Sequence, residues 1–263
     1  MKITLITVCF QSSRTIRTTL ESVLRQQDVD LDYIVVDGAS TDGTVNILEE
    51  FQPKFQGRMR WKSEPDRGMY DALNKGIAMA KGDFIGILNA DDFFQSDKSL
   101  CEIAQGLTAH PEAQVLYGDV RFVPDAKSLE DLRAGRTLRY YSARRWKPWM
   151  FQWGVMPPHP SVYIAREAFQ KLGGYQVDYK ISADFELLVR FLRKAALPTF
   201  YLPGARIGMR MGGLSTKDWH SNWTLNREDV RANRENGYFC CFPMMLPKYA
   251  FKIWEVIGVR DHV

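Results

Sequence analysis

The stretch Phe84-Ile85-Gly86-Ile87-Leu88-Asn89-Ala90-Asp91-Asp92 decides the fold. A short, continuous apolar run that ends in polar residues is typical of a strand buried in a parallel sheet. The chain upstream repeats this form and alternates it with segments of helical spacing: strands are predicted at residues 3–10, 33–36 and 58–64, and helices at 13–24, 42–51 and 73–80. We expect Ser13 and Asp42 to cap the first two helices. This alternation predicts an α/β fold, with a mostly parallel sheet covered by helices on both faces.

Acidic side chains follow three of the predicted strands at their carboxyl ends. These are Asp37, Glu64 and the pair Asp91-Asp92. In open parallel sheets, ligands bind outside the carboxyl ends of the strands. Asp and Asn also initiate turns, so any one of these residues alone has an ordinary structural explanation. Three acidic groups that separate strands deliver to one edge predict a binding site near solvent.

The second half of the chain has a less regular pattern. Helices are expected at 99–107, 165–172, 184–195 and 219–236, and strands at 115–123, 199–202 and 206–211. Residues 124–160 show no clear period, so we expect an extended loop or insertion there.

Composition limits the classes of function. The chain has 263 residues, of which 45% are hydrophobic, enough for a sizeable core. Its 35 basic and 31 acidic residues leave a net charge of +4, too small for charge alone to indicate a nucleic-acid binder. The four cysteines and four histidines follow no zinc or disulfide spacing, which favours a reducing, cytoplasmic setting. We expect neither a signal peptide nor a membrane-spanning helix.

Glycine loops that bind phosphate are missing from the sequence. No Gly-x-Gly-x-x-Gly follows the first predicted strand, and no Gly-x-x-x-x-Gly-Lys-Ser/Thr occurs. A phosphorylated ligand would therefore need a divalent cation held by carboxylates. Magnesium and manganese take one or two protein carboxylates and share the rest of their shell with phosphate and water. Asp91-Asp92 is suited to that role.

Motifs along the chain resemble those of family 2 glycosyltransferases in their order and spacing. The donor-side motifs are VDGASTDGT at 36–44, SEPDRGMYDALNKG at 63–76 and the metal-binding Asp-x-Asp region LNADD at 88–92. The acceptor-side motifs are HPS at 159–161 and SADFE at 182–186, followed by a late Gly-Gly-x-Ser element, MGGLS, at 211–215. Each motif is weak alone, and together they are specific to the family.

The resemblance implies a GT-A fold and the transfer of a sugar from a nucleotide-sugar donor, expected to be a UDP-sugar, to an acceptor hydroxyl. It also implies inversion at the sugar. On the donor side, it implies that Asp37 accepts a hydrogen bond from the base, that Asp66 lies near the base or ribose, and that Lys75 contacts the donor. Asp91 would contact ribose or metal, and Asp92 would hold Mn²⁺ or Mg²⁺ at the two phosphates.

On the acceptor side, Asp184 matches the position of the family's catalytic aspartate, which takes the proton from the acceptor hydroxyl. Alternatively, Asp184 caps the helix that it begins, a role that Ser182 could equally fill. His159, Glu186 and Arg210 are expected to support the acceptor loops, with His159 more a brace than a base.

Two positions depart from the family's pattern. Asn89 stands where many relatives have Asp, and neutral Asn is a poorer cation ligand, so the metal is assigned to Asp91 and Asp92. Gly38 stands where the first motif usually has its second aspartate, which leaves Asp37 as the sole carboxylate there.

Basic and aromatic residues interleave over residues 133–153, and apolar residues with lysines recur over 238–257. This composition is typical of a surface for an anionic membrane or single-stranded nucleic acid. With the donor motifs present, we favour the membrane and expect no nucleic-acid partner, because a lipid-linked acceptor would be both anionic and membrane-bound. A solvated loop and a contact between copies of the chain are the alternatives.

These observations predict one GT-A domain over residues 1–215, followed by a helical extension over 216–263. Residues 1–123 would form the half that binds the nucleotide-sugar, and 124–215 the acceptor half. We expect a peripheral protein on the inner face of a bacterial cell membrane that builds surface polysaccharide. The rival functions are a sugar nucleotidyltransferase, whose glycine-rich basic loop this chain lacks, and a nucleotide- or carbohydrate-binding protein with a degenerate site.

Overall fold

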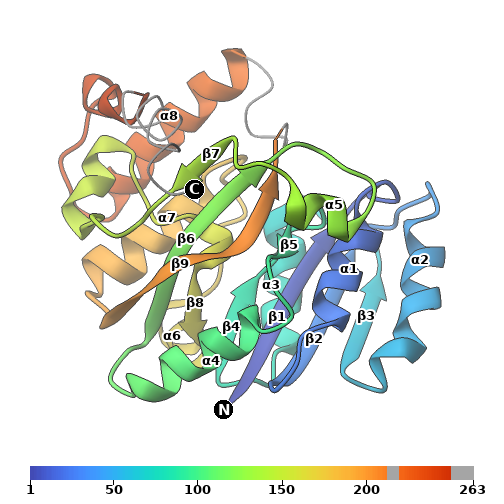
Figure 1. Cartoon of the computed structure of the whole chain (residues 1–263). Helices are drawn as coiled ribbons and strands as arrows, with labels where there is room; N and C mark the ends of the chain where they lie inside the picture. The colour runs from blue at the N-terminus through green and yellow to red at the C-terminus, as the bar shows by residue number, and fades with distance from the viewer. Residues whose placement is uncertain (212–218, 250–263) are drawn as a thin grey trace.

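A curled sheet runs through the molecule in the computed structural model, which describes residues 1–211 and 219–249 (Figure 1). Its nine strands follow the order β3-β2-β1-β4-β8-β6-β9-β5, and β7 pairs with β6. The strands are β1 (Lys2–Cys9), β2 (Asp30–Asp37), β3 (Met59–Ser63), β4 (Phe84–Ile87), β5 (Phe93–Phe94), β6 (Val115–Val123), β7 (Arg139–Tyr141), β8 (Tyr163–Ala165) and β9 (Thr199–Arg210). The first four strands are parallel, and so are β6 and β9, whereas β5, β7 and β8 run antiparallel to their neighbours.

Helices cover both faces of the sheet, as the sequence predicted. Leu5 and Cys9 of β1 pack into one buried cluster, and Ile6 and Val8 pack into the cluster on the other face. The first cluster includes residues of α1 (Ile16–Leu24), α2 (Thr44–Phe51) and α4 (Ser99–Ala109); the second includes residues of α3 (Met69–Met79), α6 (Arg166–Leu172) and α7 (Ala183–Leu188). A strand buried on both faces explains why the first strand reads as a continuous apolar run.

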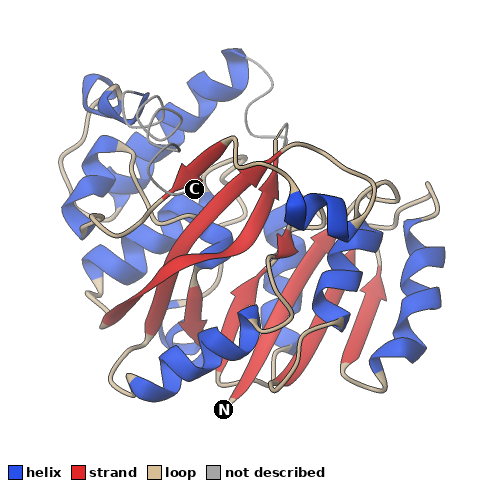
Figure 2. Cartoon of the chain, viewed as in Figure 1, coloured by secondary structure: helices blue, strands red, loops and turns tan. Residues whose placement is uncertain are grey.

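The register of the strands brings their carboxyl ends to one edge. Cys9 lies opposite Asp37 across β1 and β2, and Asp37 lies opposite Ser63 across β2 and β3. Val123 of β6 lies opposite Arg210 of β9 in the same way. The arrowheads of β1 to β3 in Figure 2 show this common direction. The last residues of these strands therefore carry the side chains from which a site can be built.

The predicted caps of the first two helices are wrong in detail. α1 begins at Ile16 after Thr15, without a side-chain cap, and the backbone N–H of Ser13 instead donates to Asp42 Oδ2 at 2.9 Å. α2 begins at Thr44 after a glycine, and Asp42 Oδ1 accepts from the Thr44 N–H at 3.0 Å from one residue further out. The two loops bind each other at the carboxyl edge, and this contact replaces the simple cap.

Residues 124–160 form ordered structure rather than the expected loop. They contain α5 (Leu129–Ala134), β7 and the 3-10 segment Pro148–Trp153. Leu129 and Leu132 belong to a small buried cluster, and Phe151 belongs to a large one. These elements are too short for a hydrophobic period to appear in the sequence.

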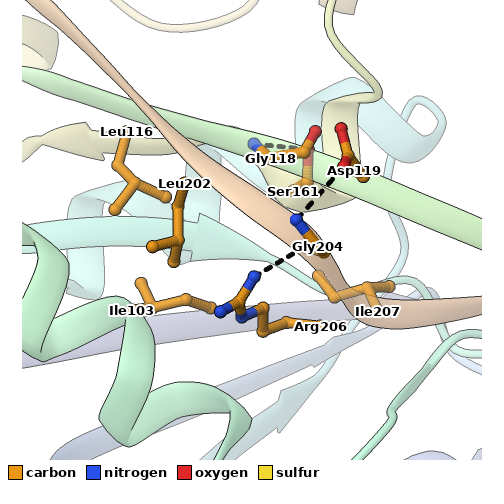
Figure 3. Close-up of a pocket in the computed structure, with 9 residues that line it drawn as sticks. All are labelled: Ile103, Leu116, Gly118, Asp119, Ser161, Leu202, Gly204, Arg206 and Ile207. Atoms are coloured by element: carbon orange, nitrogen blue, oxygen red, sulfur yellow. Dashed lines mark hydrogen bonds between the residues drawn. The ribbon is translucent and has the colours of Figure 1, made fainter. Parts of the chain in front are cut away.

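A single strand, β9, replaces the two strands predicted at 199–202 and 206–211. The interruption in the sequence comes from Gly204, whose φ of 92° is left-handed, and the pairing with β6 shifts at Asp119. Figure 3 shows Asp119 turned toward this bulge, where its Oδ2 accepts from the Gly204 N–H at 3.2 Å. The small pocket in that view is lined by Ser161 of the HPS motif but by none of the predicted donor-side residues.

The C-terminal part of the chain packs against the acceptor half. α7 begins one residue earlier than predicted and continues as a π-helical segment, Val189–Lys194. α8 (Trp219–Glu235) contacts α7 and the segment Pro148–Trp153, at the end of the molecule far from β3 (Figure 1). Among the described residues, none of the helices combines the length and the apolar character that crossing a bilayer would take. The four cysteines carry free thiols.

Candidate active site

Asp37 lies at the carboxyl end of β2 and is fully buried. Its Oδ1 accepts from the Ser40 hydroxyl at 2.5 Å and from the Cys9 thiol at 3.5 Å. Its Oδ2 accepts from the Ser40 N–H at 2.9 Å and from the Ser63 hydroxyl at 2.6 Å. A nucleotide base can therefore reach this carboxylate only if a serine hydroxyl first rotates away.

Asp66 and an exposed aromatic ring flank the glycine that follows Asp37. A Cβ atom built on Gly38 would lie 2.7 Å from Asp66 Oδ2 and 3.2 Å from the ring of Phe10. The Asp66 carboxylate thus occupies the space of the side chain that the motif usually has at this position, which accounts for the glycine. Phe10, just after β1, is 63% exposed. The exposed phenyl ring and the Asp66 carboxylate, which flank the same glycine, provide an apolar face and a polar group next to each other.

Lys75, predicted to contact the donor, is held by its own surroundings. Its Nζ lies 3.2 Å from Glu64 Oε1 and 3.6 Å from Asp71 Oδ2, and it donates to the Pro65 carbonyl at 2.9 Å. The side chain retains 27% exposure. Lys75 therefore braces the loop that carries Asp66, and its contact with a donor stays a prediction.

Asp91 and Asp92 lie in the turn after β4, as predicted, but they differ in exposure. Asp92 is only 2% exposed, which corrects the expectation that its strand end is near solvent, whereas Asp91 is partly exposed. Asn89 donates its amide to Asp92 Oδ2 at 2.7 Å, so the neutral residue orients the carboxylate. Burial raises the pKa of both carboxyl groups, and the charge of Asp91 raises the pKa of Asp92 further.

Arg210 binds both the Asp91 turn and the segment that follows β6, and its support of the acceptor loops stays a prediction. It ends β9 at the carboxyl edge, and its guanidinium donates to the Asp91 carbonyl and to Asp125 Oδ1, both at 3.0 Å. Strand β9 runs parallel to β6, and its last residue, Arg210, reaches the turn after β4 through the bond to the Asp91 carbonyl.

The donor set at Asp91 and Asp92 fits a hard divalent cation. Two adjacent carboxylates offer the oxygen ligands that Mg²⁺ and Mn²⁺ prefer. Over residues 1–211 and 219–249, no cluster of three or more His, Cys, Asp or Glu side chains forms a complete metal cage. A cation here would take its remaining ligands from donor phosphates and water.

Asp184 is the second residue of α7 and does not cap it. The position before the helix is Ser182, whose side chain makes no capping bond. Asp184 Oδ1 accepts from the Phe185 N–H at 2.9 Å and from the Tyr70 hydroxyl at 3.4 Å. Burial, and to a smaller degree the charge of Glu228, raises the pKa of Asp184 to about 6. The carboxylate is thus a stronger base than an ordinary aspartate and is ionised at neutral pH.

His159 contacts the same region through Tyr175, and its role as a brace more than a base stays a prediction. Its Nε2 lies 2.7 Å from the Tyr175 hydroxyl, and burial lowers the pKa of the imidazole to about 4. The Tyr175 ring stacks on Tyr70 with centroids 5.7 Å apart. A series of contacts therefore leads from His159 through two tyrosines to Asp184.

Glu186 is committed to a buried ion pair with Arg190. Both guanidinium contacts are 2.9 Å, and Arg190 also donates to the Gly174 carbonyl at 2.7 Å. This arrangement supports the loop after α6.

The two segments predicted for a membrane surface are only partly exposed. In the first segment, Trp146 and Phe151 are buried, and Arg133 pairs with Asp97. Its exposed basic and aromatic residues are Arg136, Arg144, Arg145, Lys147 and Trp149. The first segment contacts the second through Gln152, whose amide donates to the Phe239 carbonyl at 2.7 Å. Part of the second segment, 250–257, and the late motif at 212–215 lie outside the described residues.

Sequence reasoning missed two residues of this site. Tyr70 lies within the second donor motif, but nothing in the sequence shows that its hydroxyl reaches Asp184, which is 114 residues away. Phe10 ends the first apolar run. An aromatic residue at the end of a predicted strand was the signal that could have placed it in the site.

The family of the chain follows from its match to known proteins. The model of glycosyl transferase family 2 matches residues 4–173, well over half of the chain. The chain belongs to this family. The resemblance drawn from its motifs is confirmed. The matched residues include the donor-side carboxylates and end before Asp184.

Named relatives agree with the family. A PGL/p-HBAD biosynthesis glycosyltransferase of Mycobacterium bovis (strain BCG / Pasteur 1173P2) is 28% identical over 183 residues, 70% of this chain and 66% of the relative. An uncharacterized glycosyltransferase of Mycobacterium tuberculosis (strain ATCC 25618 / H37Rv) is 31% identical over 192 residues, 72% of this chain and 68% of the relative. The first match thus spans just under two thirds of its relative's length.

Solved structures share the fold of this family 2 glycosyltransferase. S. aureus TarS 1-349 in complex with UDP-GlcNAc has a TM-score of 0.64 at 16% identity, over 88% of this chain and 66% of that one. The mannosyltransferase PcManGT from Pyrobaculum calidifontis in complex with GDP-Man and Mn²⁺ has a TM-score of 0.63 at 19% identity, over 98% and 73%. The GT-A fold expected from the motifs is confirmed.

Proposed function

We propose that this enzyme transfers a sugar from a UDP-sugar to the hydroxyl of a saccharide or lipid-linked saccharide, with inversion and with a divalent metal. The observation that carries the proposal is Asp184, a partly exposed carboxylate with a pKa of about 6. Because an alcohol has a pKa far above 7, its attack needs a positioned base of this strength. Tyr70, from the second donor motif, bonds this base directly.

The donor side supports a nucleotide with a flat base. The exposed ring of Phe10 offers a stacking face, and Asp66 lies beside it as a hydrogen-bond acceptor for base or ribose. Asp37 accepts from the base if Ser63 or Ser40 releases it. UDP is favoured because TarS, a structural neighbour, binds UDP-GlcNAc. Lys75 holds this loop and contacts the donor's charged groups.

Asp91 and Asp92 would hold Mn²⁺ or Mg²⁺. When bound, the cation neutralises the charge that grows on the departing nucleoside diphosphate. Asn89 and Arg210 keep the turn in position, since one orients Asp92 and the other binds the Asp91 carbonyl. The Mn²⁺ in the related mannosyltransferase structure supports the choice of metal.

The transfer is a single displacement. The acceptor oxygen attacks the anomeric carbon as its proton passes to the Asp184 carboxylate, and the bond from that carbon to the phosphate oxygen breaks. The electron pair of the broken bond leaves with the nucleoside diphosphate. Attack opposite the leaving group inverts the anomeric centre and requires only one base. His159 stays neutral and holds Tyr175 behind it.

The test of this function uses water in place of the acceptor. The purified enzyme is incubated with UDP-, GDP- and dTDP-sugars, with and without Mn²⁺, and the free nucleoside diphosphate is measured. We expect metal-dependent release of UDP. Nucleotide binding without release from any donor would favour the binding protein, and formation of a nucleotide-sugar from a nucleoside triphosphate and a sugar phosphate would favour the nucleotidyltransferase.

We further propose that the enzyme works as a peripheral protein on the inner face of the membrane. Support comes from the exposed Arg144, Arg145, Lys147 and Trp149, next to Phe239, which is 75% exposed. Basic and aromatic side chains suit an anionic bilayer surface. In this view residues 1–123 bind the donor, 124–215 the acceptor, and the extension 216–263 adds to the membrane-facing surface.

Vesicle binding tests the membrane contact. Replacing Arg144, Arg145 and Lys147 by Gln should weaken binding to phosphatidylglycerol vesicles by about 1 kcal/mol per charge. The effect should shrink as salt rises. Equal vesicle binding by this variant and the wild type at low salt would contradict the contact.

A further inference from the structure

Glu228 of α8 binds the loop that precedes the base. Its side chain is buried, and its Oε1 accepts from the Lys180 N–H at 2.8 Å. Its Oε2 accepts from the N–H groups of Ile181 and Ser182, both at 2.9 Å. Three consecutive backbone donors thus converge on one carboxylate, and a concave set of amides of this kind binds an anion strongly. The next residue but one after this loop is Asp184.

The loop is held from its other side by α3. The Tyr70 hydroxyl donates to the Ile181 carbonyl and also reaches Asp184 Oδ1. α8 therefore binds backbone N–H groups of the loop, and α3 binds one of its backbone carbonyl oxygens. Because these contacts hold the loop from both sides, they also position the start of α7 and the Asp184 carboxylate.

The charges around Asp184 come from several elements. Tyr70 of α3 and Tyr175 face it with hydroxyls that stay neutral, since burial raises the pKa of each. From α8, Asp229 interacts with it electrostatically, but Asp229 pairs with the buried Lys248 at 2.8 Å. Glu228 has no such cation among its hydrogen-bond partners, which are backbone amides.

We infer that Glu228 is a positioning residue for sugar transfer, which fixes the loop before Asp184 and so places the base against the acceptor hydroxyl. This inference rests on the proposed role of Asp184. It makes α8, which lies beyond the residues matched by the family model, part of the catalytic apparatus. The negative charge of Glu228 also contributes to the raised pKa of Asp184, after burial.

The test is Glu228→Gln, measured by UDP release from UDP-GlcNAc across a pH series. A glutamine keeps the shape, but its NH₂ group meets backbone N–H donors, so the loop shifts. We expect kcat to fall roughly 10- to 100-fold, the cost of a displacement of about 1 Å at a catalytic group. The acid limb of the profile should move to lower pH, because a negative charge near Asp184 is lost. The KM for the donor should not change.

Glu235→Gln is the matched control on the same helix. Glu235 accepts from the Tyr179 hydroxyl at 2.7 Å and pairs with Arg231, and its side chain is half exposed. This variant should keep the wild-type kcat and acid limb. If Glu228→Gln and Glu235→Gln give the same profile as the wild type, the inference is overturned. If Glu228→Gln does not fold, Glu228→Asp decides: a normal kcat overturns the inference, and a lower kcat with an unmoved acid limb supports it.

A double variant separates this inference from the proposed function. If Glu228 acts through Asp184, adding Glu228→Gln to Asp184→Asn should cause no further loss, because residues that act as a unit are not additive. Independent losses that multiply would overturn the role of Glu228 and leave the base assignment intact. Wild-type turnover by Asp184→Asn alone would instead overturn the proposed function.

Discussion

Asp37 and Asp184 are both carboxylates that the family motifs assign to the reaction, but their surroundings are opposite. Asp37 accepts four hydrogen bonds, from Cys9, Ser40 and Ser63, across both oxygens. Asp184 accepts from Phe185 and Tyr70, and both bonds end on Oδ1. Asp37 is thus held by donors on both of its oxygens, whereas burial raises the pKa of Asp184.

The two regions also differ in how the chain assembles them. The donor edge consists of strand ends, whose parallel register alone brings Asp37, Ser63 and the Asp91 turn to one side. The base is surrounded by side chains of α3, α7 and α8 and of the loop at Tyr175. The donor edge therefore depends on the sheet, and the base depends on the packing of helices that are far apart in the sequence.

Asp184→Asn tests the difference most strongly. The amide keeps the size and the bond from Phe185 but cannot accept the proton, so UDP release should fall by roughly 10²- to 10⁴-fold. In the wild type, activity should be lost as the pH falls through about 6, because protonation of Asp184 removes the base. Donor affinity should be unchanged, since the residues proposed to bind the donor lie in the other region. Near-normal turnover would mean that another residue is the general base and that Asp184 has only a structural role.

Much of the donor edge could be predicted from the sequence for a physical reason. A strand buried on both faces reads as an apolar run, and its end is marked by the first polar residue, as at Asp37 and Asn89. Asp66 was identified only by the resemblance, whereas the positions of Asp37, Asp91 and Asp92 at the carboxyl edge follow from that pattern. Their burial does not, because the exposure of Asp92 depends on how Thr19 of α1 packs against its turn.

The base region was predictable only as a motif. The resemblance identifies Asp184, but its raised pKa comes from burial among side chains more than 40 positions away, such as Tyr70 and Glu228. The sequence does not reveal that β9 ends beside the Asp91 turn, where Arg210 binds the Asp91 carbonyl. Short elements such as β7 leave no period, and so 124–160 was predicted to be a loop.

Asp92→Asn tests the donor edge. UDP affinity should lose its dependence on Mn²⁺. Loss of a residue that only hydrogen-bonds to a metal ligand typically weakens metal binding roughly 10- to 100-fold, and loss of the ligand itself should weaken it at least as much. Isothermal calorimetry with and without Mn²⁺ measures the change. Asp125→Asn is the control, because Asp125 binds the same arginine, Arg210, but lies outside the carboxylate pair. An unchanged metal dependence in Asp92→Asn would remove the cation from this turn.

Phe10→Ala tests whether the donor edge binds the base by stacking. Loss of an aromatic face should weaken UDP binding by about 1–3 kcal/mol, equally with and without Mn²⁺. Because Phe10 is 63% exposed, the melting temperature should change little. Phe239→Ala, at a ring that is 75% exposed on the other side of the fold, should bind UDP normally. If both variants bind UDP like the wild type, the nucleotide base does not bind at Phe10.

The smallest expected effect is a change in the free energy of unfolding, and it tests the comparison between Asp37 and Asp184. Asp184 has a pKa of about 6 when folded against an ordinary value of 3.8, so the folded protein binds more protons between these values. Stability therefore falls as the pH rises through that window, and above it the ionised base destabilises the fold. Asp184→Asn removes this cost and should be more stable than the wild type at pH 7.

Urea unfolding of both proteins over a pH series measures this difference. The gap should be absent near the ordinary pKa, open as the pH rises and reach its full size above about pH 6. Asp178→Asn is a control of opposite sign, because Arg231 lowers the pKa of Asp178 and the ion pair stabilises the fold at neutral pH. If burial keeps the Asp184 carboxylate basic, Asp184→Asn should be both inactive and more stable than the wild type at neutral pH. A gap that does not change with pH would mean that Asp184 is as well solvated as an ordinary aspartate, and the contrast with Asp37 would then rest on position alone.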